Sequence, residues 1–330
     1  MGERRIKSIR MRTLLKNKKS LSYVGLIFVV FIWGLTPITS KYFLNYYSPT
    51  FGVAWGDIFS VAVLAFIFRK RLKNITKDYF KVAIPLGVFY TSANLMQKIG
   101  LQYTTPTVYS FLENLSCIVV PFLTWWFIRK KPAVLQIVGS SICLISAFVL
   151  SGIGASSGFS LGVGEILCGL AGVFYGINIA GTGAFTKKFD SALYIMVLLF
   201  VECMLSLIVA ITFNFITING APIETIRFSW NPVLLLSRIA IVLISSTLCW
   251  VIRTNSMKHV DATVVAVMMP FSSIVAGILS VLVGMDELSV NLVLGAILGL
   301  MAMIICAFGD IMVDKKARER EERLSREEGE

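Results

Sequence analysis

Long apolar runs separated by short polar segments dominate this chain. Ten of the runs approach the ~20 residues that a helix needs to cross ~30 Å of hydrocarbon. They cover residues 22–44, 49–68, 80–102, 106–128, 133–152, 162–186, 190–214, 233–252, 262–283 and 291–312. Their length is typical of membrane spans rather than of helices in a soluble core. The pattern therefore predicts an all-α integral membrane protein with ten transmembrane helices.

The predicted spans divide into two groups of five at the Gly/Ser-rich segment 151–160. Because five is odd, the second group enters the membrane from the opposite side, and related halves form an inverted repeat, as in many secondary transporters. Three correspondences favour such a repeat: Trp33-Gly34 with Tyr175-Gly176, Pro121 with Pro270, and Gly139 with Gly295. The predicted domains are a basic cytoplasmic arm (1–21), a first repeat (22–152), an external linker (153–161), a second repeat (162–312) and a charged cytoplasmic tail (313–330).

The basic residues are segregated along the chain. Of 31 Lys and Arg residues, 27 lie in the N-terminal arm, in four alternate loops and in the C-terminal tail, all of which face one side of a ten-span protein. Under the positive-inside rule this side is the cytoplasm. The sequence therefore predicts a multi-pass protein of the plasma or inner membrane with both termini in the cytoplasm. Four residues break the pattern: Lys41, Lys98, Arg227 and Arg238.

Composition agrees with this interpretation, since 56% of the residues are hydrophobic, 15% are charged and the mean hydropathy is +0.78. The net charge of +12 is explained by topology and by attraction of the basic segments to anionic lipid at the cytoplasmic face. Nucleic-acid binding is therefore not expected. The six cysteines have no paired spacing that predicts a metal site or a disulfide framework.

Three acidic residues fall inside predicted spans: Asp57, Glu113 and Glu202. A charge within the membrane costs several kcal/mol by insertion scales, so each acid is a functional hypothesis. A buried carboxyl group can bind a cation or take up a proton, because loss of water disfavours its charged form. An interhelical ion pair or hydrogen bond is the alternative for each acid.

Glu113 is the strongest candidate because Ser110, Asn114 and Cys117 share its helix face, and a polar stripe avoids lipid. Comparable stripes supply further candidates for binding a substrate or a proton: Trp33, Thr36 and Lys41 on the first span, Asn94, Gln97 and Lys98 on the third, Tyr175 and Asn178 on the sixth, and Arg238 on the eighth. Helix packing is the favoured alternative for Tyr175 and Asn178, whereas Arg238 could extend to the membrane interface or pair with Glu113 or Asp57. An excess of cations in the outer half favours an anionic or zwitterionic substrate group.

Enzymatic chemistry finds little support. The one histidine, His259, lies in a predicted cytoplasmic loop, and the sequence contains no Gly-rich phosphate loop, metal cluster or nucleophile elbow. No cofactor is predicted, and energy for transport would come from a gradient or a partner. A membrane enzyme, a lipid-handling protein and a non-transporting scaffold remain alternatives.

Several segments resemble EamA-type members of the drug/metabolite transporter superfamily. The likeness rests on residues 33–41, on Ser48-Pro49, on residues 100–104, on Pro121, and on residues 284–288 leading into Gly295. It covers residues 22–312. The resemblance implies an inverted-repeat fold with a central cavity, and transport, usually export, of amino acids or other small metabolites without ATP.

Two departures from the family pattern concern charge. The family often has an arginine where this chain has Gly56-Asp57, and an acidic residue where this chain has the basic segment 129–131, whereas Glu287 keeps the acidic residue of the second half. The sequence as a whole predicts a transporter in which two halves rock around a small-molecule site near Trp33, Asn94, Glu113 and Asn178. Proton coupling through Glu113 or Asp57 is a narrower prediction, and a homodimer is left open.

Overall fold

The computed structural model describes residues 2–113, 115–128, 134–150, 162–185, 188–218, 221–256, 268, 271–302, 304–305, 308–309 and 312. Pro270, Asn114, His259, the linker 153–161 and the tail 313–330 therefore lie outside the described residues.

The described chain is almost entirely helical, which confirms the predicted all-α class. Its first half contains α1 (Gly2–Phe43), α2 (Pro49–Ile67), the 3-10 turn η1 (Arg69–Asn74), α3 (Lys77–Tyr103), α4 (Pro106–Glu113), α5 (Ser116–Ile128) and α6 (Val134–Leu150). The second half contains α7 (Val163–Phe185), α8 (Ser191–Phe215), a hairpin of β1 (Thr217–Ile218) and β2 (Ala221–Pro222), α9 (Pro232–Val242), the π-helical segment η2 (Leu243–Leu248), α10 (Cys249–Ser256) and α12 (Phe271–Leu282). A further helix covers Val290–Ala302.

Within the described ranges, five helical segments are long and apolar enough to cross a membrane: Ser20–Phe43, Pro49–Ile67, Val163–Phe185, Ser191–Phe215 and Pro232–Ser256. The segment Pro232–Ser256 joins α9, the π-helical segment η2 and α10 into one continuous helix. The predicted span 106–128 is instead two helices, because α4 ends at Glu113 and α5 begins at Ser116. The backbone of α7 approaches this break closely, since a Cβ atom added at Gly172 would lie 2.6 Å from the carbonyl oxygen of Leu112.

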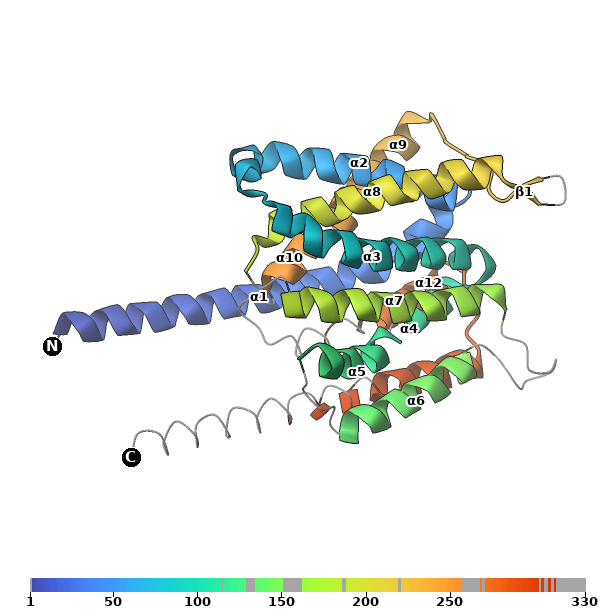
Figure 1. Cartoon of the computed structure of the whole chain (residues 1–330). Helices are drawn as coiled ribbons and strands as arrows, with labels where there is room; N and C mark the ends of the chain where they lie inside the picture. Colours follow the sequence, from blue (N-terminus) through green and yellow to red (C-terminus); the bar gives the residue numbers. More distant parts are fainter. Residues whose placement is uncertain are drawn as a thin grey trace.

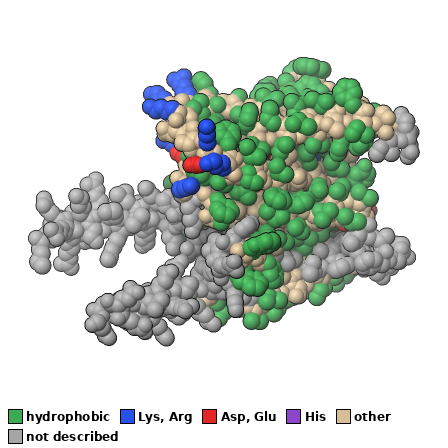
Figure 2. All heavy atoms as spheres, in the orientation of Figure 1, with side chains coloured by type: hydrophobic (Ala, Val, Ile, Leu, Met, Phe, Trp, Pro, Cys, Tyr) green, Lys and Arg blue, Asp and Glu red, His purple; other side chains and the backbone are tan. Residues whose placement is uncertain are grey.

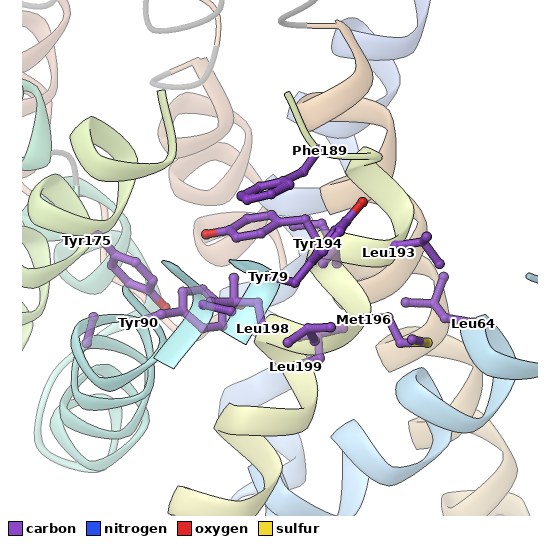
Figure 3. Packing of buried hydrophobic residues seen from close by; sticks show 14 of the residues in the cluster. Leu64, Tyr79, Tyr90, Tyr175, Phe189, Leu193, Tyr194, Met196, Leu198 and Leu199 are labelled. Atoms are coloured by element: carbon purple, nitrogen blue, oxygen red, sulfur yellow. The ribbon is translucent and has the colours of Figure 1, made fainter. Parts of the chain in front are cut away.

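Helices that are distant in sequence pack side by side (Figure 1). Helix α3 contacts α7 and α8, α2 contacts α8, and α1 contacts α10 and α12. Helix α4 lies between α7 and α12. Figure 3 shows the largest cluster of buried apolar residues, in which the N-terminal half of α8 meets α2, α3 and α7. Every residue from Ser191 to Leu199 is buried, so α8 is the central helix of this core.

On the face shown in Figure 2, apolar side chains cover the described helices, and the visible Lys and Arg side chains gather at one end. Large exposed side chains such as Phe66, Trp126 and Ile208 cover the sides, as expected where lipid replaces water. At the charged end, Arg71 of η1 forms an ion pair of 3.3 Å with Asp190. Nearby, Lys81 donates a hydrogen bond to Asp78 and lowers the pKa of that carboxyl group. The molecule is therefore built as a multi-pass membrane protein.

Two glycines allow close helix contacts in the two halves. A Cβ atom added at Gly34 would lie 2.5 Å from Val275 Cβ and 2.9 Å from the carbonyl oxygen of Ser272. A Cβ atom added at Gly176 would lie 3.0 Å from Val119 Cβ and 3.4 Å from the carbonyl oxygen of Ser116. Val119 and Ser116, which meet Gly176, each lie 156 positions before their counterparts Val275 and Ser272, which meet Gly34. Gly139 and Gly295 are separated by the same 156 positions.

Candidate functional site

A cavity of about 650 Å³ lies between α1, α3, α4, α7, η2 and α10. Its wall contains seven of the residues singled out from the sequence: Trp33, Thr36, Asn94, Gln97, Lys98, Glu113 and Tyr175. The polar stripes of the first, third and fourth predicted spans therefore do meet around one space.

One cation and one anion face this cavity without pairing. Lys98 Nζ donates hydrogen bonds to Ser40 Oγ (2.9 Å) and to the hydroxyl of Tyr109 (3.1 Å). Glu113 Oε2 accepts a hydrogen bond of 2.7 Å from Gln97 Nε2. Although the structure describes both side chains, Lys98 and Glu113 form no direct salt bridge with each other. The cavity thus offers two opposite charges at separate places.

Gln97 is held in place by a second bond. The hydroxyl of Tyr175 donates a hydrogen bond to Gln97 Oε1 at 3.0 Å, and the amide nitrogen of Gln97 donates to Glu113. This chain joins α7 through α3 to α4. It fixes the orientation of the Gln97 amide and thereby the position of the Glu113 carboxylate.

Aromatic rings form a continuous wall of the same cavity. The ring of Trp250 lies 5.3 Å from Trp33 and 5.2 Å from Tyr90, and Tyr90 lies 5.8 Å from Tyr175, as measured between ring centroids. Figure 3 shows Tyr90 and Tyr175 approaching each other. Trp33 Nε1 donates a 3.0 Å hydrogen bond to the carbonyl oxygen of Ser245, which lies in the π-helical segment. The wall can cover an apolar part of a ligand.

Two residues near the cavity were missed by the sequence argument. The guanidinium of Arg253 lies over the rings of Trp250 (5.0 Å) and Trp33 (5.8 Å). In the sequence, Arg253 belongs to a predicted cytoplasmic basic segment, and Tyr109 is not among the predicted site residues. Spacing on one helix cannot reveal a contact that depends on the rotation of a neighbouring helix.

A second cavity of about 380 Å³ adjoins the first, and Thr36, Asn94, Lys98, Ser245 and Ser246 line both. Asp57 and Arg238 belong to the second cavity alone. The Arg238 guanidinium lies 5.3 Å from the ring centre of Phe43.

Asp57 is 4% exposed and Glu202 is fully buried. They lie on the two helices α2 and α8, which pack against each other, and each acts electrostatically on the other. Asn94 Nδ2 donates a 2.6 Å hydrogen bond to Glu202 Oε1. The structure thus brings together two of the three acids singled out from the sequence.

Other predicted site residues have structural partners. Lys41 Nζ donates to the carbonyl oxygens of Leu101, Gln102 and Thr104, which end α3. Asn178 Nδ2 donates to the carbonyl oxygen of Leu86 at 3.0 Å. Neither Lys41 nor Asn178 lines the two cavities.

Three comparisons with known proteins bear on the site. Residues 20–152 match the model of the EamA-like transporter family, which confirms the resemblance over the first half. An uncharacterized transporter of Archaeoglobus fulgidus is 25% identical over 290 residues, which cover 87% of this chain and 86% of that protein. A protein of known crystal structure shares the fold with a TM-score of 0.60 at 13% identity, covering 89% of this chain and 99% of that one. The family match and the relative support a membrane transporter.

Proposed function

We propose that this chain, whose first half matches the EamA-like transporter family, is a secondary transporter that exports amino acids or other small metabolites. It works by alternating access in the plasma or inner membrane, with both termini in the cytoplasm. One observation carries the proposal: Lys98 and Glu113 face one cavity separately, and a wall of aromatic rings completes it.

The charges suit a zwitterion. An α-amino acid carries a carboxylate and an ammonium group on one carbon, so it can engage Lys98 and Glu113 at the same time. Charge-assisted hydrogen bonds are about twice as strong as neutral ones. The aromatic wall then contacts the substrate side chain, and a large apolar side chain fits this wall best.

Matched contacts between the two halves support an inverted repeat of ten spans. Helix α1 of the first half contacts α10 and α12 of the second, and α7 of the second half likewise contacts α3, α4 and α5 of the first. The halves also meet where α2 contacts α8 and where α4 contacts α12. The equivalent contacts of Gly34 and Gly176 follow the same relation. Rocking of one half against the other would open the cavity to each side of the membrane in turn.

Such a protein is not an enzyme, because a transporter releases its substrate chemically unchanged. The energy comes from a gradient. The membrane lipid contacts the exposed apolar sides, and anionic headgroups attract the basic cytoplasmic segments.

The test uses purified protein in proteoliposomes and counterflow of each of the twenty L-amino acids. At least one amino acid with a large apolar side chain should exchange across the membrane. Lys98→Met and Glu113→Gln should each lower its kcat/KM about tenfold or more, since a hydrogen bond to a charged group is worth ~1.5–3 kcal/mol. The exposed Glu287 supplies the matched control, and Glu287→Gln should leave transport unchanged. Absence of counterflow for all twenty compounds, or full activity in both cavity variants, would contradict the proposal.

A further inference from the structure

Asp57 and Glu202 form a buried acid pair in the contact between α2 and α8. Asp57 lies in the middle of α2 and Glu202 in the middle of α8. Each carboxyl group has one fully buried oxygen, Oδ2 of Asp57 and Oε2 of Glu202, that receives no hydrogen bond from an N–H or O–H group of the described residues. Asn94 donates to Glu202 and lines the second cavity together with Asp57, so the two acids lie close together where α2 packs on α8.

Two ionised carboxylates cannot bond to each other, because a carboxylate only accepts hydrogen bonds. A proton on one of them changes the interaction from repulsion to an O–H···O⁻ hydrogen bond, which is among the strong kinds. We propose that Asp57 and Glu202 share one proton, and that release and uptake of this proton couple substrate transport to a proton gradient. This inference rests on the transport function proposed above.

The charged neighbours make the shared proton exchangeable. Arg238 of α9 and Lys98 of α3 are the nearest cations, and neither forms a salt bridge with the two acids, all four side chains being described. Lys98 instead bonds to Ser40 and Tyr109. The cations therefore reduce the cost of a second negative charge without removing it. Among the described residues, the other titratable groups that interact with the pair are Tyr90 of α3, Tyr175 of α7 and Cys203 of α8.

Asn94 and Lys98 connect the proton site to the substrate site. Both residues line both cavities, and Asn94 donates directly to Glu202. Loss of the shared proton would place a second negative charge beside the Asn94 amide and attract Lys98 toward the pair. A substrate carboxylate that binds Lys98 competes with this attraction. Proton release and substrate binding thus act on the same two side chains.

The proton site is tested without any substrate. Purified wild-type protein in lipid nanodiscs is titrated with acid and base while the infrared C=O stretch of protonated carboxyl groups is recorded. One titrating band should be lost in Asp57→Asn and also in Glu202→Gln, because an amide N–H then takes the place of the shared proton. Glu113→Gln, whose carboxylate already accepts a bond from Gln97, should keep the band. A band that persists in both acid-pair variants would overturn the inference.

Coupling is tested in proteoliposomes with the twenty L-amino acids. Asp57→Asn and Glu202→Gln should keep counterflow, which needs no gradient, and lose accumulation driven by an imposed pH gradient. Accumulation that stays as strongly gradient-dependent as in the wild type would refute the coupling. If wild-type protein shows the infrared band but no counterflow of any compound, the proposed transport function fails while the proton site stands.

Discussion

At the residue scale, two lysines that break the charge pattern have different surroundings. Lys98 is half-buried beside the cavity, between Ser40 and Tyr109. Lys41 lies at the end of α3, where its ammonium group bonds to the last carbonyl oxygens of that helix. A cation at a helix C-terminus satisfies backbone groups that have no partner within the helix and complements the helix dipole. Sequence position alone does not separate these roles.

We therefore expect Lys41→Met to affect stability rather than transport. Its loss should lower the free energy of unfolding by about 1–2 kcal/mol, less than a buried charged hydrogen bond is worth because the side chain is partly exposed. SDS titration of the purified protein followed by tryptophan fluorescence measures this change, and counterflow measures transport. A Lys41→Met protein with wild-type stability and impaired counterflow would instead assign Lys41 to the substrate path.

At the element scale, close helix contacts depend on glycine. Helix α1 approaches α12 at Gly34, and α7 approaches α5 at Gly176. In a membrane, lipid is as apolar as the helix surface, so association depends on close packing that small residues permit. The Gly34 contact is tighter: an added Cβ at Gly34 would lie 2.5 Å from its nearest neighbour, whereas one at Gly176 would lie 3.0 Å from its nearest neighbour.

Gly34→Ala should consequently destabilise the protein by ~1–3 kcal/mol through overpacking against Val275, and Gly176→Ala should cost less. The second substitution Val275→Ala should recover part of the loss in Gly34→Ala. Gly183 in α7 is the matched control, since a Cβ atom added there meets nothing within 4 Å. Gly183→Ala should leave stability unchanged or raise it by ~0.5–1 kcal/mol. Equal thermal stability of the Gly34→Ala and Gly183→Ala proteins would show that the α1–α12 contact is looser than described.

At the scale of the whole molecule, charge defines two ends of the bundle. The end formed by η1 and the start of α3 carries clustered Lys and Arg side chains (Figure 2), whereas the hairpin of β1 and β2 lies at the opposite end (Figure 1). The positive-inside rule therefore predicts that the first end faces the cytoplasm. The proposed direction of transport is defined relative to this orientation.

Labelling of single cysteines tests the orientation. In a background without the six native cysteines, Thr225→Cys should react with a membrane-impermeant maleimide in intact cells. Asn74→Cys should react only after the cells are permeabilised. Both positions are exposed in the described structure, so a difference in labelling reports the side of the membrane. The reverse pattern would invert the orientation, and with it the direction assigned to export.

The sequence by itself determined the structural class, because the hydropathy of a span is local and each membrane helix satisfies its own backbone groups. It also identified Asp57, Glu113 and Glu202 as unusual, because the cost of an intramembrane charge does not depend on the neighbouring helices. Polar periodicity placed Gln97 and Glu113 on inward faces, and they do line one cavity.

Only the tertiary structure decided which of these residues meet. Asp57 of α2 lies close to Glu202 of α8, and the bond from Gln97 to Glu113 joins α3 to α4. The tertiary structure also placed Lys41 at the end of α3 and showed that the predicted span 106–128 consists of two helices. Such contacts depend on the rotation and distance of neighbouring helices, which are set by packing across the whole bundle. The periodicity of one helix does not contain that information.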